Sequence, residues 1–177
     1  MSLISFGNNK EGISFKVLEE RNMRASGGLM FLLGLIAFNN VFFLQNYEVV
    51  LYVSGFLMLN FIIGIFINPK FAPTLFLSWL LVRKQSPIYI GAIQKRFAWS
   101  LGLVLATVIF VLSIFLQNDI TYFEPVCLLC LICLVLLFFE VAFGICIGCK
   151  LYYLAIFLKL LKKPEEMPNC MGDACEV

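Results

Sequence analysis

Four long apolar windows constrain the fold of this chain more than any other feature. They cover residues 25–44, 49–67, 97–116 and 125–145, and each approaches the roughly 20 residues that a helix needs to cross a bilayer. The chain is 62% hydrophobic and 14% charged, whereas soluble domains average about 45–50% and about 25%. The sequence therefore predicts an all-α fold, a four-helix transmembrane bundle in contact with the lipid bilayer.

Two further apolar stretches, residues 71–82 and 151–161, are too short to span. At 1.5 Å per residue each would reach only about 15–18 Å across a hydrocarbon core of about 30 Å. Lys70 and Arg83 flank the first stretch, and Lys150 and Lys162 flank the second. Basic residues at both ends indicate that each stretch returns to the side it left. We expect two short interfacial or re-entrant helices.

The charges are distributed unequally between the two sides of the predicted bundle. Glu48, Asp119 and Glu124 lie in the two loops that contain no basic residue. All 13 basic residues fall in the other three regions: Lys10, Lys16, Arg21 and Arg24; Lys70, Arg83, Lys84, Lys95 and Arg96; Lys150, Lys159, Lys162 and Lys163. By the positive-inside rule, both termini are predicted to be cytoplasmic.

This layout divides the chain into a cytoplasmic N-terminal segment, 1–24, a four-span membrane domain, 25–161, and a flexible cytoplasmic tail, 162–177. The start, MSLISFGNNKEG, is polar and mixed, so no cleavable signal is expected. The net charge of +2 gives no argument for nucleic acid as a partner. The chain contains no histidine, which excludes Ser-His and Cys-His catalysis and any His-ligated metal site.

The most suggestive motif is GICIGCK, which contains Cys146 and Cys149 at the end of the fourth window. Their spacing puts both sulfurs on one helical face, close enough for a disulfide or a soft metal. Gly144 and Gly148 favour a break in the helix. If a new helix starts near Lys150, Cys149 lies at a helix N-terminus beside a cation, which would make it a nucleophile. The alternative is two small residues at a close helix contact.

Several polar residues lie within or at the edge of the predicted spans. The asparagines Asn39, Asn40, Asn60 and Asn68 are expected to form interhelical hydrogen bonds. Glu140 lies one turn before Gly144 and is a candidate catalytic residue, because an intramembrane carboxylate should face protein or water. Its alternative role is an ion pair with a nearby base such as Lys150 or Arg96.

The other cysteines form two groups. Cys170 and Cys175, in the tail, are candidate accessory thiols that could reach the Cys146–Cys149 pair. These four thiols could hold a soft metal such as Cu(I) or Zn, although the sequence requires no cofactor. The group Cys127, Cys130 and Cys133 begins the fourth window, and Cys130 lies about 24 Å of helix from Cys146. The simplest interpretation of this group is packing as small hydrophobes.

Three stretches together resemble a known bacterial membrane family. They are NPKFAP with SPIYIGA, the run AIQKRFAWSLG, and FFEVAFGICIGCKLYYL. The chain is similar to the family called domain of unknown function 4395, over about residues 18–161, and carries its GxCxGCxxY signature at Gly144, Cys146, Gly148, Cys149 and Tyr152. The resemblance implies a four-span layout in a bacterial cytoplasmic membrane, and an association of some members with thioredoxin-like or sulfur-transfer proteins.

The KRFAW stretch lies at the predicted cytoplasmic edge of the third span. Trp99 is expected to anchor the helix at the interface, and Lys95 and Arg96 to fix its orientation. These two cations could also lower the pKa of the cysteine pair or hold an anionic sulfur species.

Three functions remain open from the sequence. The first is a membrane thiol protein that handles thiol–disulfide electrons or sulfane sulfur through Cys146 and Cys149, with a thioredoxin-like or sulfurtransferase partner. The second is a transporter or channel for a small sulfur oxyanion, which with four spans would require a homo-oligomer, and in which segment 71–82 and Glu140 would line the path. The third is a soft-metal-binding or structural scaffold.

Overall fold

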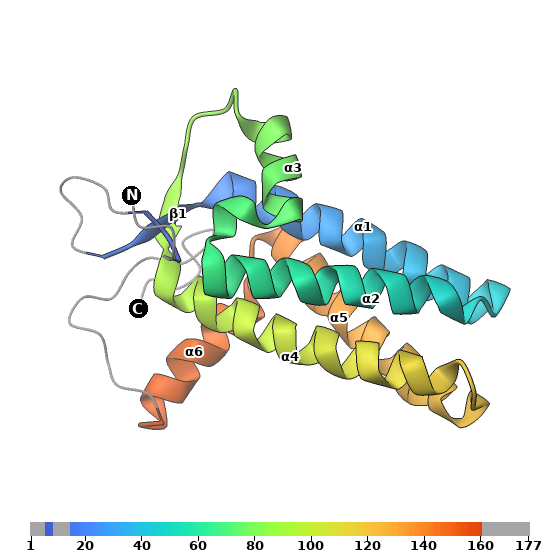
Figure 1. The fold of residues 1–177 in the computed structure, drawn as a ribbon. Coiled ribbons are helices and arrows are strands. Elements are labelled where there is room, and N and C mark those ends of the chain that lie inside the picture. The colour runs from blue at the N-terminus through green and yellow to red at the C-terminus, as the bar shows by residue number, and fades with distance from the viewer. Residues whose placement is uncertain (1–5, 9–14, 161–177) are drawn as a thin grey trace.

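The computed structural model describes residues 6–8 and 15–160 and contains an antiparallel bundle of four long helices (Figure 1). The helices are α1 (Glu20–Leu44), α2 (Tyr47–Ile62, continued by a π-helical turn, Ile63–Ile67), α4 (Ala92–Leu116) and α5 (Phe123–Phe143, preceded by a 3-10 turn, Ile120–Tyr122). With these turns included, all four are long and apolar enough to cross a membrane. The predicted all-α bundle of four spans is confirmed.

The first and third spans begin about five residues earlier than the apolar windows indicated. Helix α1 starts at Glu20 and α4 at Ala92, so that Arg24 and Lys95 are helical residues and not part of a preceding loop. Hydropathy marks the lipid-facing length of a helix, whereas the helix itself continues for a further turn or more into the polar region. Two spans therefore carry charged side chains on their first turns.

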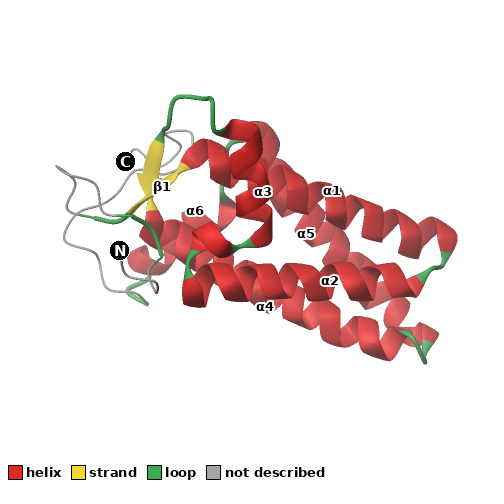
Figure 2. Cartoon of the chain, turned by 45° about the horizontal axis from the view of Figure 1, so that its top comes forward, coloured by secondary structure: helices red, strands yellow, loops and turns green. Residues whose placement is uncertain are grey.

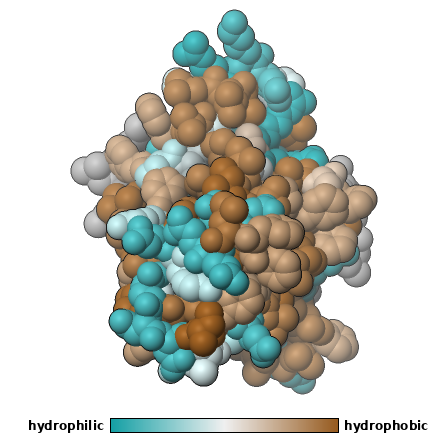
Figure 3. Space-filling model, turned by 90° about the vertical axis from the view of Figure 1, so that its right-hand side faces the viewer, coloured by the Kyte–Doolittle hydropathy of each residue, from teal (hydrophilic) through white to brown (hydrophobic). Residues whose placement is uncertain are grey.

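The sides of the bundle are apolar and its two ends are polar. Large hydrophobic side chains such as Leu32, Val104 and Leu128 are exposed along the spans. Figure 3 views the molecule from the end at which α1 joins α2 and α4 joins α5, and shows hydrophilic atoms on that end with hydrophobic atoms around them. This distribution is the one expected for helices that face acyl chains.

A small antiparallel ribbon joins the entrances of α1 and α4. Strand β1 (Val17–Glu19) pairs with β2 (Tyr89–Gly91), with Leu18 opposite Ile90. Each strand leads directly into a long helix, and because the strands are antiparallel, α1 and α4 start from opposite ends of the ribbon (Figure 2). We call this end of the bundle, which also carries α3 and α6, the basic end, because the described lysines and arginines gather in its segments.

The two short helices leave the bundle at the basic end, on opposite sides in Figure 1. They are α3 (Pro73–Val82) and α6 (Ile147–Phe157), and neither is long enough to span. Helix α3 exposes the apolar side chains of Phe76, Leu77 and Leu81. This agrees with the predicted pair of short helices, although α6 begins four residues before the predicted stretch.

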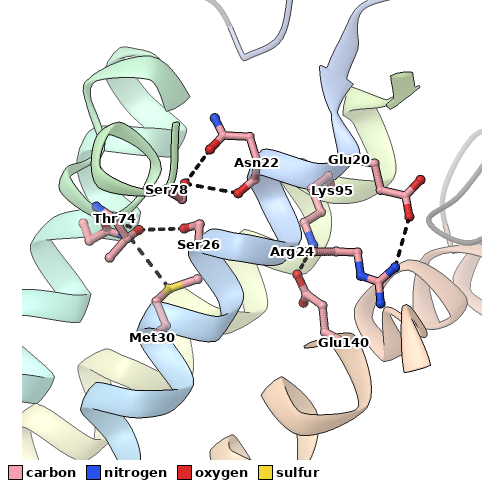
Figure 4. Close-up of polar contacts among 10 residues, drawn as sticks. Glu20, Asn22, Arg24, Ser26, Met30, Thr74, Ser78, Lys95 and Glu140 are labelled. Atoms are coloured by element: carbon pink, nitrogen blue, oxygen red, sulfur yellow. Dashed lines mark hydrogen bonds and ion pairs between the residues drawn. The ribbon is translucent and has the colours of Figure 1, made fainter. Parts of the chain in front are cut away.

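A buried polar network attaches α3 to α1 and α2. The side-chain carbonyl of Asn60 accepts from the Thr74 backbone N–H (3.0 Å) and hydroxyl (2.9 Å), and Ser26 and Thr74 share a hydrogen bond of 2.8 Å (Figure 4). Asn60 thus satisfies one of the N–H groups that the start of α3 leaves without a helical partner. The expected interhelical role is confirmed for Asn60. It is wrong for Asn39 and Asn40, which donate to carbonyls of their own helix.

Candidate functional site

The helical backbone is interrupted between α5 and α6, at the cysteine motif. Gly144 has φ +68°, the left-handed conformation that commonly ends a helix, and its N–H bonds the Phe139 carbonyl. Cys146 is extended and stands at the N-cap of α6, which begins at Ile147. The sequence predicted an interruption here from its two glycines, and the structure confirms it.

The break places Cys146 and Cys149 in the first turn of α6. The Cys149 N–H donates to the Cys146 carbonyl at 3.0 Å, and only 5% of Cys146 and 3% of Cys149 are exposed. The N-terminus of a helix carries partial positive charge and favours a nearby anion, here a thiolate. The sequence predicted this environment for Cys149. In the structure Cys146 occupies the N-cap position, so Cys146 is a better candidate for the nucleophile than Cys149.

The nearest cation is Lys95 and not the predicted Lys150. Lys95 is buried on the first turn of α4 and forms an ion pair with Glu140 of α5 (Figure 4). Lys150, by contrast, is exposed, and so is Arg96, the other partner expected for Glu140. The periodicity of α4 explains the difference, because it turns Lys95 into the bundle and Arg96 to the surface.

These groups lower the pKa of the Cys146 thiol below its ordinary value. The main cause is a hydrogen bond from the Cys149 thiol, and the charge of Lys95 acts in the same direction. Burial and the Glu140 carboxylate raise the pKa, but they do not outweigh the first two effects. The arrangement therefore favours the thiolate of Cys146 more than an ordinary cysteine environment does.

Arg24 closes the end of α5, a role that the sequence did not suggest. Its guanidinium donates to the Val141 carbonyl at 3.1 Å and lies 3.8 Å from the Glu20 carboxylate (Figure 4). The last carbonyls of a helix have no partner within it, so this bond satisfies one of them. Arg24 thereby links α1 to the turn that carries the cysteines.

The remaining signature residues pack α6 against α4. A Cβ on Gly148 would lie 2.6 Å from the Ala98 Cβ, so only glycine allows this approach of the two helices. The Tyr152 ring lies 5.6 Å from that of Phe97. A further link, from the Gln94 amide to the Tyr153 hydroxyl at 2.8 Å, could not be found from the sequence, because neither residue stood out in the pattern.

Trp99 lies in the core of the basic end instead of at a lipid interface. It is 4% exposed, and its ring contacts those of Phe61 and Phe6. A Cβ on Gly64 would come within 2.2 Å of the indole. The expected interfacial anchor is therefore wrong. The π-helical turn at the end of α2 and its glycine leave room for a tryptophan that packs beside the cysteine pair.

The other cysteines are not brought to this site. Cys127, Cys130 and Cys133 lie along α5 and pack against a second apolar cluster, which contains Ala37, Val50 and Val126. Cys170 and Cys175 lie outside the described residues. Within residues 6–8 and 15–160, no group of three or more cysteine or acidic side chains is placed to hold a metal ion.

Comparison with known proteins gives one finding. The sequence model of a protein family described as domain of unknown function, DUF4395, matches residues 18–156. The match includes both strands, all six α-helices up to Ile156, and the whole cysteine motif. No curated protein and no solved structure matches the chain.

Proposed function

The chain belongs to the DUF4395 family, and we propose that it is a membrane thiol protein in which Cys146 and Cys149 form a working pair. The pair would accept or pass on thiol–disulfide electrons or sulfane sulfur. The observation that carries the proposal is the position of Cys146 at the N-cap of α6, with a lowered pKa and with Cys149 three residues away.

The chemistry uses the two thiols in sequence. The Cys146 thiolate attacks an S–S bond of a donor, that bond breaks, and the donor thiolate leaves and takes up a proton. Cys149 then attacks the mixed disulfide, so that an intramolecular disulfide forms and the second donor thiol is released. With a persulfide donor, the first step instead leaves the sulfane sulfur on Cys146, from which an acceptor thiol can remove it.

We also propose that the basic end faces the cytoplasm of a bacterial cell. Lys70, Arg83, Lys84 and Lys150 are among the bases in its segments, whereas Glu48, Asp119 and Glu124 lie at the other end. The positive-inside rule then places both termini in the cytoplasm. A thioredoxin-like or sulfurtransferase protein is the kind of partner that could meet the pair there, with the tail thiols Cys170 and Cys175 as a second carrier.

The transporter alternative gains less support from the structure. Helix α3, which was expected to line a solute path, packs on the outside of α1, and none of its residues lines the cavity within the bundle. The cavity within the bundle does include Glu140, but the rest of its wall is almost entirely apolar, and such a wall does not suit a sulfur oxyanion.

A direct test uses purified protein in which Cys127, Cys130, Cys133, Cys170 and Cys175 are replaced by serine. Mild oxidation should form a Cys146–Cys149 disulfide that dithiothreitol reverses, read as a loss of two free thiols. Incubation of the reduced protein with a low-molecular-weight persulfide should transfer one sulfur atom to Cys146, read as a gain of 32 Da (the mass of sulfur). Failure of both reactions in folded protein would reject the proposal. The Cys146→Ser and Cys149→Ser variants are the controls.

A further inference from the structure

A cavity of about 160 Å³ lies between the helices of the bundle and reaches Cys146. Helix α4 lines it from Ala98 to Ile109, which corresponds to about 16 Å at 1.5 Å per residue. A volume of this size spread over three turns of a helix makes the space long and narrow. Cys146 and Glu140 lie on its wall together with Cys130 and Cys133, so one cavity touches both groups of cysteines.

The wall is apolar apart from a few groups. Ser54 and Glu140 contribute polar atoms, and the other lining residues are mainly leucine, alanine, valine and phenylalanine. Cavities of about 150 Å³ with apolar walls stay dry and accept small apolar molecules. The cavity therefore suits a slim hydrophobic compound better than water or an ion.

The cavity gives a small molecule access to a thiol that is buried from the outside. Cys146 and Cys149 are almost fully covered from outside, which hinders attack on a large protein substrate. Cys146 is nevertheless part of the cavity wall. A molecule that enters from the membrane interior would meet this sulfur without any unfolding of the basic end.

We propose that the cavity binds an isoprenoid quinone, with its ring beside Cys146 and Glu140 and its chain along α4. This inference rests on the proposed function, for which it names the electron acceptor: a thiol partner reduces the Cys146–Cys149 disulfide by the reverse of the exchange described above, and the quinone then oxidises the pair again. A dithiol needs a two-electron oxidant, and quinones are apolar two-electron oxidants that dissolve in the bilayer. A flat ring on a slim chain also matches the length and apolar wall of the cavity.

The reaction balances without any further reactant. The Cys146 and Cys149 thiols together lose two electrons and two protons, and an S–S bond forms between them. The quinone gains the same two electrons and two protons and leaves as a quinol.

Binding can be tested separately from oxidation, because Trp99 lines the cavity. The chain has two tryptophans, so Trp79→Phe, on the exposed face of α3, leaves Trp99 as the only tryptophan. Decylubiquinone should quench this fluorescence saturably in detergent-purified protein. Ala106→Leu or Ser54→Leu, which fill the cavity from two helices, should weaken quenching about tenfold, whereas Val108→Phe, on the exposed face of α4, should not.

Oxidation is then followed on the same samples. Reduced protein should convert about one decylubiquinone to quinol per Cys146–Cys149 disulfide formed, and Cys149→Ser should bind the quinone without forming quinol. Monodispersity and a melting curve exclude unfolding of Ala106→Leu and Ser54→Leu. Both variants should give the same loss of quinone binding, because each fills the cavity from a different helix.

Three results would overturn the inference. They are the absence of saturable quenching, quenching without quinol, and quinol formation that Ala106→Leu and Ser54→Leu leave unchanged. The disulfide and persulfide reactions described under the proposed function need no quinone. Their success alongside any of these results would reject the quinone and leave the thiol pair intact.

Discussion

Lys95 and Glu140 form a buried ion pair between the first turn of α4 and the last turn of α5, beside the two cysteines. Two spans that are far apart in the sequence are thereby joined next to the interruption between α5 and α6. The pair also places one positive and one negative charge near Cys146, with opposite effects on its thiolate. Stability and reactivity at this end of the bundle therefore depend on the same two side chains.

Removing one partner of this pair should destabilise the protein strongly. Glu140→Gln leaves the Lys95 ammonium buried without its counter-charge, and breaking a buried pair in this way costs about 3–5 kcal/mol. Unfolding by sodium dodecyl sulfate in mixed micelles measures the loss. Glu48→Gln is the control, because Glu48 is exposed, and substitutions at the surface usually change stability by no more than about 0.5 kcal/mol. Equal losses in the two variants would contradict this assignment.

The two charges should move the reactivity of Cys146 in opposite directions. The positive Lys95 favours the thiolate, so Lys95→Met raises the Cys146 pKa and shifts the alkylation profile to higher pH. The negative Glu140 disfavours the thiolate, so Glu140→Gln lowers the pKa and shifts the profile to lower pH. Iodoacetamide rates between pH 5 and pH 10 are the measurement (a range set about the usual cysteine pKa of roughly 8.5). Shifts of the same sign would show that the variants act through unfolding.

Gly144 should resist replacement because of its backbone conformation. At φ +68°, a Cβ costs about 1–2 kcal/mol, so Gly144→Ala should lower stability by this amount. Gly28→Ala is the matched control. Gly28 lies inside α1, where a Cβ would meet only an ordinary contact at 3.8 Å, so alanine there should be neutral or stabilising by up to about 1 kcal/mol. Tolerance of alanine at 144 would mean that α5 continues through this point.

The contact between Gly148 and Ala98 should behave as a coupled pair. Gly148→Ala would put two methyl groups 2.6 Å apart, which forces α6 away from α4 and should destabilise the protein by about 1–3 kcal/mol. Ala98→Gly removes the opposing methyl group, and the double variant should recover only part of this loss, because the new Cβ would still lie 2.9 Å from the Cα at position 98. A double-mutant cycle measures the coupling. Additive effects would show that the two helices do not touch at these residues.

Much of the architecture could be predicted from the sequence because hydrophobic length and charge distribution act over whole segments. The four spans and two short helices follow from windows of about 10 to 20 residues, and the break at Gly144 from a local preference. The β1–β2 ribbon could not be predicted, since strands of three residues carry no readable alternation. Its pairing also depends on segments about 70 residues apart.

The candidate site was predictable in its residues and less so in their roles. The spacing of Cys146 and Cys149 identified the pair, and Lys95 and Glu140 were both noted. Their pairing, however, depends on the rotation of α4 relative to α5, which no local pattern determines. The burial of Trp99 depends in the same way on Gly64, in a different helix, and the contribution of Arg24 depends on the position of the α5 C-terminus.

The measurement that tests the central claim most directly is the pH dependence of alkylation at Cys146, in protein that keeps only Cys146 and Cys149. The account predicts that Cys146 reacts first, with an apparent pKa below the roughly 8.5 of a free cysteine. It also predicts that Cys149→Ala raises this pKa, because alanine has no donor and the hydrogen bond to the thiolate is lost. An apparent pKa at or above that of free cysteine in folded protein, unchanged in Cys149→Ala, would contradict it.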